Sequence, residues 1–171
     1  MSIAGSVLSP ALNNVSISVM TEHDLSEVVE IEEQCELSRW GWNAYHAELQ
    51  TSGRGLMLVA RVCQSAKTDA AYSLAGYIAA RLTGSELHIN NVAVRQPFRR
   101  RGLGSALLVR ILAEGKRLGA LAAFLEVRAG NVAAQALYER CGLHIVGQRP
   151  NYYSQPVEDA TIMSVPLEQD A

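Results

Sequence analysis

The sequence predicts a single α/β domain of mixed α and β content, and three observations predict it. The chain has 171 residues, which is the size of one domain. Its apolar residues follow strand and helix periods in the order β-α-α-β-β-β-α-β-α-β-β. No internal repeat or low-complexity segment interrupts that order. We therefore expect a flexible lead-in over residues 1–14 and one domain over residues 15–171.

The composition is that of a folded soluble protein. Apolar residues make up 49% of the chain and charged residues 19%, and the formal net charge is −2, whereas a general nucleic-acid coat is plainly basic. No apolar run approaches the roughly 18–20 residues of a membrane helix, and no leader is recognisable at the start. The three cysteines and four histidines form no ligand cluster. We expect a cytoplasmic protein with no metal, no nucleic-acid partner and no membrane contact.

The first third of the chain predicts one strand and two helices. Residues 15–19 alternate valine or isoleucine with serine, which is the period of a half-buried strand. Asp24 precedes a helical repeat of apolar residues and Glu27 stands three positions later, so this pair predicts a capping box. A short second helix is predicted over residues 43–50, after an aromatic turn at residues 39–42.

The remainder of the chain alternates strands and helices. An amphipathic helix begins at Leu103 and is closed by Gly119. A further helix runs from Asn131 until Gly142 ends it, and a loop between the last two strands holds residues 151–153. The predicted strands are 56–62, 74–82, 86–95, 121–127, 143–147 and 161–165, and a polar loop around 67–69 joins the first two.

The strand over residues 86–95 changes phase in its middle. Leu87 and Ile89 share one face, but the apolar residues resume at Val92 and Val94, out of phase by one. One extra residue at 90–91 restores the alternation, which predicts a β-bulge. Bulges often lie beside active sites.

A basic loop joins this strand to the next helix. It carries four arginines within residues 95–101, followed by Gly102 and Gly104. A helix N-terminus offers unpaired N–H groups and the positive end of the helix dipole, and glycine lets a ligand approach the backbone. The loop therefore suits a diphosphate or triphosphate, although it is not a Walker loop. The alternative is a basic turn that shields the start of the helix.

Three further positions are candidates for chemistry. Glu126 lies on a buried strand, where a carboxylate costs free energy unless it is paired or functional, so it is either a general base or an ion-pair partner of Arg128 or of the basic loop. Asn131 and Tyr138 are seven positions apart and share one helix face. Asn131 can cap the helix and still reach a ligand, and Tyr138 is either a proton donor or a core residue.

Together these residues resemble the GNAT superfamily of acetyl-CoA-dependent N-acetyltransferases, over residues 15–167. Residues 99–104 match the family's Q/R-x-x-G-x-G/A pyrophosphate loop. Within the superfamily the chain resembles the RimI-type enzymes, which acetylate the N-terminal α-amine of a ribosomal protein. The segments that carry this resemblance are 92–94, 125–131, 136–142, 149–153 and 158–163.

The resemblance implies a mixed, mostly antiparallel sheet with a β-bulge, splayed middle strands and helices on both faces. It implies an enzyme that moves the acetyl group of acetyl-CoA directly to the N-terminal α-amine of a protein. The implied substrate is a ribosomal protein with an N-terminal alanine. We expect a monomer. We also expect the acidic first helix, through Glu30, Glu32 and Glu33, to attract a basic N-terminal segment.

The resemblance also implies residue roles. Glu126 would be the general base and Tyr138 the general acid, and the N–H of Val94 would stabilise the oxyanion. Trp40, Trp42, Tyr152 and Tyr153 would clamp the peptide; read alone, these aromatic residues are buried anchors or a surface plug. The cofactor-binding residues would be Val92, Ala93, Val94, Arg99, Arg100, Arg101, Gly102, Leu103, Gly104, Ser105 and Asn131.

Three other functions remain open. Related enzymes act on small amines or lysine side chains, but Tyr152 and Tyr153 suit an extended peptide backbone. A non-catalytic acetyl-CoA sensor would bind the cofactor without turnover, and the pair of Glu126 and Tyr138 argues against it. RNA binding by the basic loop is disfavoured by the net charge of −2.

Overall fold

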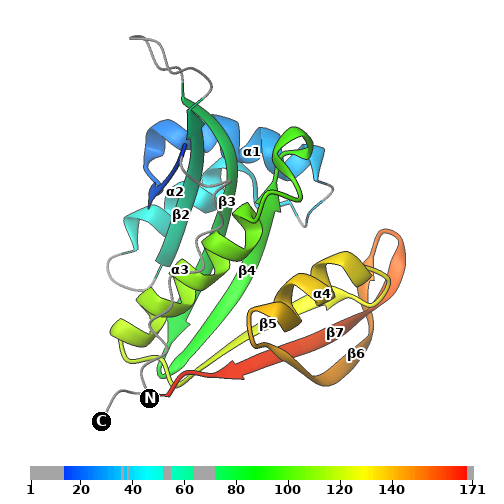
Figure 1. The fold of residues 1–171 in the computed structure, drawn as a ribbon. Helices are drawn as coiled ribbons and strands as arrows, with labels where there is room; N and C mark the ends of the chain where they lie inside the picture. Colours follow the sequence, from blue (N-terminus) through cyan, green and yellow to red (C-terminus); the bar gives the residue numbers. More distant parts are fainter. Residues whose placement is uncertain (1–13, 36, 38, 52–54, 64–71, 169–171) are drawn as a thin grey trace.

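Seven strands form one sheet in the order β1-β2-β3-β4-β5-β7-β6, with helices on both faces (Figure 1). The computed structural model describes residues 14–35, 37, 39–51, 55–63 and 72–168. Residues 1–13 of the predicted lead-in over 1–14, and the predicted loop around 67–69, lie outside the described residues. The strands are β1 (Val15–Val19), β2 (Gly55–Cys63), β3 (Tyr72–Thr83), β4 (Glu86–Val94), β5 (Ala122–Arg128), β6 (His144–Ser154) and β7 (Val157–Pro166). The helices are α1 (Leu25–Gln34), α2 (Gly41–Gln50), α3 (Leu103–Arg117) and α4 (Val132–Arg140), with 3-10 turns η2 (Glu22–Asp24) and η3 (Gln96–Phe98).

The middle strands splay apart, as the resemblance implied. Strands β4 and β5 pair in parallel only from Glu86 to Ile89 on β4, and every other neighbouring pair of strands is antiparallel. Beyond Ile89 the two strands diverge (Figure 1). After Ile89, the N–H and C=O groups of β4 that face β5 are therefore not paired with that strand.

The predicted β-bulge is confirmed. Ala79 of β3 pairs with Asn91 and Ala80 pairs with Ile89, so Asn90 is the extra residue on β4. Strand β3 also approaches β4 closely beyond the bulge, because a Cβ at Gly76 would lie 2.5 Å from the carbonyl oxygen of Ala93. A side chain at that position would force the two strands apart.

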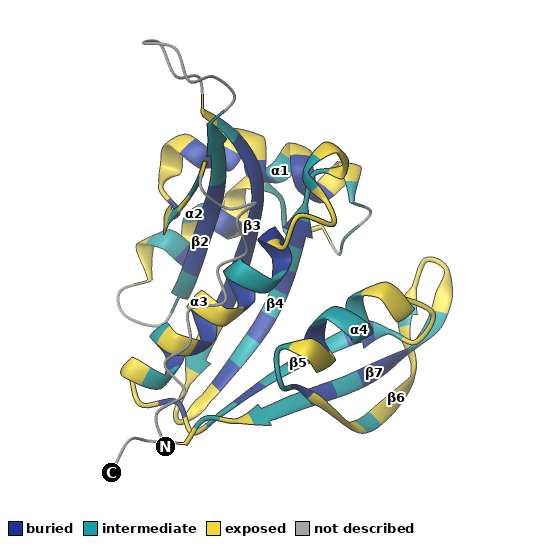
Figure 2. Ribbon diagram, in the orientation of Figure 1, coloured by how far each residue is buried: buried dark blue, intermediate teal, exposed yellow. Residues whose placement is uncertain are grey.

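Two apolar cores lie on the two faces of the sheet (Figure 2). Helix α3 packs over β2, β3 and β4 on one face, with α4 beside it. Helices α1 and α2 pack over β2, β3 and β4 on the other face. Residues alternate between the faces along each strand. Leu125 and Val127 of β5 belong to the α3 core, so Glu126 between them points to the opposite face.

Two local predictions were wrong. The helix α1 begins at Leu25 without a side-chain cap from Asp24. Instead Asp24 turns back to accept hydrogen bonds from the N–H and hydroxyl of Thr21, and it pairs with Arg61. A capping box is therefore present, but it is formed by Thr21 and Asp24 at the turn η2. The spacing of Asp24 and Glu27 had predicted one at the start of α1.

The second wrong prediction concerns residues 151–153, which lie inside β6 rather than in a loop. The last hairpin is longer than the apolar pattern indicated, because β6 is exposed along most of its length. Its pairing with β7 is irregular between Arg149 and Tyr153. Asn151 adopts a left-handed φ of 52° there, and its N–H donates to the Asp159 carboxylate at 2.8 Å.

Candidate active site

A pocket of about 830 Å³ lies between β4, α3 and α4, where the strands splay. It collects ten of the eleven residues predicted to bind the cofactor. Arg101 alone is not in the lining, because its guanidinium lies over the ring of Phe98 at 5.7 Å. The lining residues are Cys35, Leu37, Val92, Ala93, Val94, Arg99, Arg100, Gly102, Leu103, Gly104, Ser105, Asn131, Ala133, Ala134, Ala136, Leu137, Tyr138 and Arg140.

The loop before α3 exposes the first N–H groups of that helix. Arg100 and Gly102 adopt left-handed φ values of 61° and 84°, and no side chain caps the helix start. The N–H of Ala106 donates to the carbonyl of Gly102, which leaves the N–H groups of residues 103–105 outside the helical pattern. These donors, with the helix dipole and Arg100 in the same pocket, form a site that fits a diphosphate.

Two other residues predicted to bind the cofactor also make hydrogen bonds within the protein. Arg99 donates from Nε to the carbonyl of Val94 at 2.8 Å and from Nη2 to the sulfur of Cys35 at 3.3 Å, so it closes the loop against β4. The Asn131 side chain caps α4 by accepting the N–H of Ala134 at 3.1 Å, and it still lines the pocket. The predicted cap is confirmed, and the contact of Asn131 with the cofactor stays a prediction.

The geometry of β4 leaves the N–H of Val94 directed into the splay. The N–H of Arg95 donates to the carbonyl of Ala75 on β3 at 2.8 Å. Successive N–H groups of a strand point to opposite sides. The N–H of Val94 therefore points away from β3, toward the side on which β5 has diverged.

Glu126 lies between the side chains of His88 and Arg149 on the face opposite α3. Its Oε2 lies 2.6 Å from Nε2 of His88, and its Oε1 lies 3.5 Å from Nη1 of Arg149. The Glu126 side chain is 11% exposed. The predicted alternative partner was wrong, since Arg128 instead pairs with Glu158 at 3.0 Å.

Tyr138 lies on the other side of the splay from Glu126. It is buried on α4 within the α3 core and lines the pocket, and this burial raises the pKa of its phenol to about 12. The phenol therefore stays protonated at physiological pH. A carboxylate and a phenol thus stand on opposite faces of the sheet, one on each side of the point where β4 and β5 part.

A second pocket, of about 620 Å³, opens on the face that carries Glu126. Trp40 lines this pocket, whereas Trp42 stacks on His46 with the ring centroids 4.6 Å apart. Of the two tryptophans predicted to hold the peptide, only Trp40 lines this pocket. The lining residues are Arg39, Trp40, Ala44, Ala47, Glu48, Arg81, Thr83, His88 and Asn90.

The two tyrosines predicted to clamp a peptide lie side by side on β6. Tyr152 is 46% exposed, and the guanidinium of Arg149 lies 5.7 Å from its ring centroid. Tyr153 packs edge-on against Tyr152, and Arg128 stacks over it at 4.2 Å. Arg149 therefore contacts both Tyr152 and Glu126.

A model of the acetyltransferase (GNAT) family matches residues 25–143, which include the bulged strand, the basic loop, Glu126 and Tyr138. The chain belongs to the GNAT acetyltransferase family. It is an acyltransferase that uses acetyl-CoA, and the uncapped helix start in the first pocket fits the diphosphate of that molecule.

Known acetyltransferases match this acetyltransferase over nearly its whole length. The ribosomal protein bS18-alanine N-acetyltransferase of Salmonella typhimurium is 33% identical over 154 residues, which cover 89% of this chain and 97% of the relative. The crystal structure of the corresponding Escherichia coli enzyme superposes with a TM-score of 0.76 at 29% identity, covering 92% of this chain and 96% of that one. NAA60 of Arabidopsis thaliana in complex with acetyl-CoA shares the fold, with a TM-score of 0.77 at 16% identity over 90% and 98% of the two chains.

Sequence reasoning missed the structural role of Glu32, which is buried and organises the loop before α2. Its carboxylate accepts hydrogen bonds from the N–H groups of Trp40 at 2.8 Å and Gly41 at 3.0 Å, and from the hydroxyl of Tyr45 at 2.9 Å. The amide of Asn91, at the bulge, donates to the same hydroxyl at 2.8 Å. A signal was present, because Glu32 lies seven positions after Leu25 and so falls on the apolar stripe of α1.

His88 and Arg149 were also missed as neighbours of Glu126. His88 is reached through the parallel pairing of β4 with β5, and Arg149 through the placement of β7 between β5 and β6. No local pattern in the sequence encodes either pairing.

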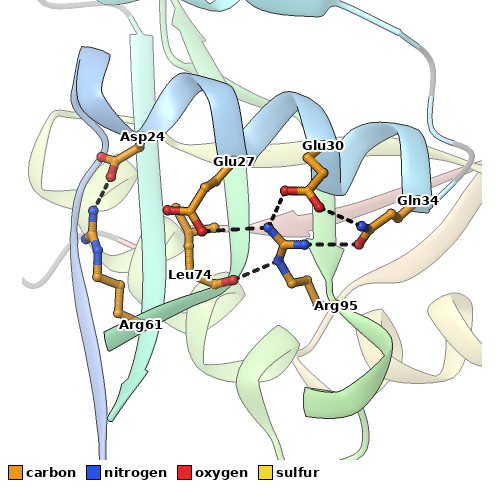
Figure 3. Close-up of polar contacts among 7 residues, drawn as sticks. All are labelled: Asp24, Glu27, Glu30, Gln34, Arg61, Leu74 and Arg95. Carbon is orange, nitrogen blue, oxygen red and sulfur yellow. Dashed lines mark hydrogen bonds and ion pairs between the residues drawn. The ribbon is translucent and has the colours of Figure 1, made fainter. Parts of the chain in front are cut away.

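The structure corrects the role expected of the acidic first helix (Figure 3). Arg95 donates to Glu30 at 3.0 Å and to Gln34 at 3.2 Å, and it also pairs with Glu27 at 3.7 Å. The guanidinium of Arg95 lowers the pKa of the Glu30 carboxyl. Glu32 is buried, so of the three glutamates expected to attract a substrate only Glu33 is exposed and without an ion pair among the described residues.

Two absences apply to the described ranges alone. No helix there is both long and apolar enough to cross a membrane. In the same part of the chain, no three histidine, cysteine, aspartate or glutamate side chains are grouped so that they could hold a metal ion.

Proposed function

We propose that this acetyltransferase acetylates the N-terminal α-amine of a ribosomal protein that begins with alanine. The observation that carries the proposal is the position of Glu126 at the splay, on the face of the sheet opposite α3, with Tyr138 across from it. The relatives named above as ribosomal protein bS18-alanine N-acetyltransferases support the choice of substrate.

The cofactor would lie in the pocket between α3 and α4, with its diphosphate on the helix start. Arg100 and the N–H groups of residues 103–105 would hold the diphosphate, and the backbone of residues 92–94 would align the pantetheine arm. Asn131, Arg99 and Arg101 would complete the loop. When bound, acetyl-CoA supplies an activated acetyl thioester.

Glu126 would take the proton that the substrate amine must lose before it attacks. An α-amine titrates near 8 and a lysine amine near 10.4, so the α-amine is the easier group to deprotonate. The N–H of Val94 would donate to the negative charge that develops on the carbonyl oxygen. Tyr138 would act on the acid side of the reaction by donating a hydrogen bond from its phenol to the leaving sulfur.

Trp40 and Tyr152 would hold the first residues of the peptide on either side of Glu126. Trp40 lines the second pocket, and Tyr152 is exposed beside Arg149. Trp42 and Tyr153 would support them, since each stacks on a neighbouring side chain. We assign the acetyltransferase domain to residues 15–171, as a cytoplasmic monomer without a nucleic-acid partner.

The test is the rate of acetyl transfer to a peptide with a free N-terminal alanine, measured by CoA release. Glu126→Gln should lower kcat by about 100-fold or more, the usual effect of removing a general base. The matched control is Glu86→Gln, because Glu86 is exposed at the start of β4. Equal rates for the two variants would contradict the assignment of Glu126.

A further inference from the structure

The side chain closest to the Glu126 carboxylate is an imidazole that also reaches the second pocket. Nε2 of His88 lies 2.6 Å from Oε2 of Glu126. The His88 side chain is 45% exposed and lines the pocket of about 620 Å³, whereas the Glu126 side chain is 11% exposed. His88 therefore connects a shielded carboxylate with open solvent.

We propose that His88 is the residue through which the proton taken by Glu126 leaves the site. His88 is a positioning and relay residue, because it acts through Glu126 and not on the substrate itself. The inference rests on the proposed function, since it takes Glu126 as the group that deprotonates the amine.

The proton balance of the relay is complete within the two side chains. The Glu126 carboxylate takes one proton from the substrate ammonium, which leaves a neutral amine and a neutral carboxylic acid. That acid gives its proton to Nε2 of His88, which accepts it in the tautomer protonated at Nδ1. The carboxylate is restored, and the imidazolium releases its Nδ1 proton to water in the second pocket.

As a chemical type, an imidazole is a stronger base than a carboxylate, so a group of this type can take over the proton that a carboxylate has accepted from the amine. Release of that proton to water in the second pocket leaves the carboxylate ready to accept the next one.

The charged groups around His88 include two arginines that are themselves paired. Arg149 pairs with the other oxygen of Glu126 and holds the carboxylate against His88. Arg81, the register partner of His88 on β3, is engaged by Glu48 through its Nε at 3.0 Å and through Nη2. The charged groups that face His88 are Glu126, with Arg149 behind it, and Arg39, Glu48 and Arg81 of the second pocket.

The test compares His88→Gln with His144→Gln in the full chain, using CoA release at saturating acetyl-CoA. Glutamine can still donate a hydrogen bond to Glu126 but cannot carry a proton. His144 is exposed at the start of β6 and is the matched control. We expect His88→Gln to lower kcat about 10- to 100-fold, with KM values for peptide and acetyl-CoA within about 2-fold of the unmodified enzyme. We also expect added imidazole to restore part of the rate of His88→Ala.

Each outcome decides the relay. Equal kcat for His88→Gln and His144→Gln, or no rescue by imidazole, would overturn it while leaving Glu126 as the base. If the enzyme acetylates a lysine peptide and no free N-terminus, the proposed function fails, and the same comparison on the lysine peptide decides the relay separately. If no amine is acetylated, both proposals are overturned.

Discussion

Tyr138 illustrates how burial constrains a catalytic assignment at the scale of a residue. An ordinary thiol titrates near 8.5, whereas burial raises the pKa of the Tyr138 phenol to about 12. Full transfer of the phenol proton to a thiolate is therefore uphill by roughly 3.5 pH units. The same phenol is an excellent hydrogen-bond donor, because it keeps its proton at every physiological pH. We infer that its main contribution is a hydrogen bond to the developing thiolate.

Tyr138→Phe should accordingly lower kcat about 10- to 100-fold, the effect of one lost hydrogen bond to a charged group. Tyr72→Phe is the control, since Tyr72 is 57% exposed at the start of β3. The substitution should also change the alkaline stability. A folded-state pKa raised from 10 to about 12 contributes stability below pH 10 that is lost as pH rises toward 12. The free energy of unfolding should fall less steeply over that interval in Tyr138→Phe, and an unchanged slope would contradict the burial argument.

Individual residues were predictable where a local pattern identifies them. Asn131 at a helix start, Tyr138 two turns later and the bulge at residues 90–91 follow from spacing alone. The partners of Glu126 did not follow, because His88 reaches it across a parallel pair of strands whose register no short segment encodes. The structural role of Glu32 was hidden for a different reason, since its negative charge was grouped with those of Glu30 and Glu33 as an attraction for a basic segment.

At the scale of elements, a buried polar network connects the loop before α2 to the bulge of β4. Glu32 accepts from the backbone of that loop and from the Tyr45 hydroxyl, and Asn91 donates to the same hydroxyl. A carboxylate at the first N–H groups of α2 is also favoured by the helix dipole. Trp40 is therefore held at the second pocket by contacts that extend to the strand beside the splay.

Replacing Glu32 with glutamine should loosen this loop. The loss of charge-assisted hydrogen bonds from a buried position should cost about 2 kcal/mol of unfolding free energy. The KM for the peptide should rise several-fold, while the KM for acetyl-CoA should change less, because none of the described hydrogen-bond donors to the Glu32 carboxylate lines the cofactor pocket. Denaturant unfolding and steady-state kinetics measure the two effects. Glu33→Gln, the exposed neighbour, should change neither, and equal behaviour of the two variants would remove the positioning role of Glu32.

Most elements could be predicted because their patterns are amphipathic and their ends are marked. The helix α3 ends before Gly119 as expected, and α4 ends before Gly142. The extent of β6 could not be predicted, because a strand exposed along most of its length shows no apolar alternation. The capping of α1 failed because Asp24 had two possible partners, and the tight turn with Thr21 competed successfully.

At the scale of the whole molecule, the splay between β4 and β5 joins two pockets that lie on opposite faces of one sheet. One pocket fits the cofactor beside Tyr138, and the other opens beside His88 and Glu126. Two substrates that approach from opposite faces can meet where the strands part, so direct transfer between them needs no covalent enzyme intermediate. The fold thus accounts for the separation of Glu126, the proposed base, from Tyr138, the proposed acid.

The most direct test of this account is a competition between two amines on one peptide. The peptide begins with a free alanine, followed by arginine, and carries one internal lysine, and mass spectrometry locates the acetyl group after incubation with acetyl-CoA. We predict acetylation of the N-terminal α-amine alone. Acetylation of the lysine side chain, or equal acetylation of both amines, would contradict the claim that this enzyme acts on protein N-termini.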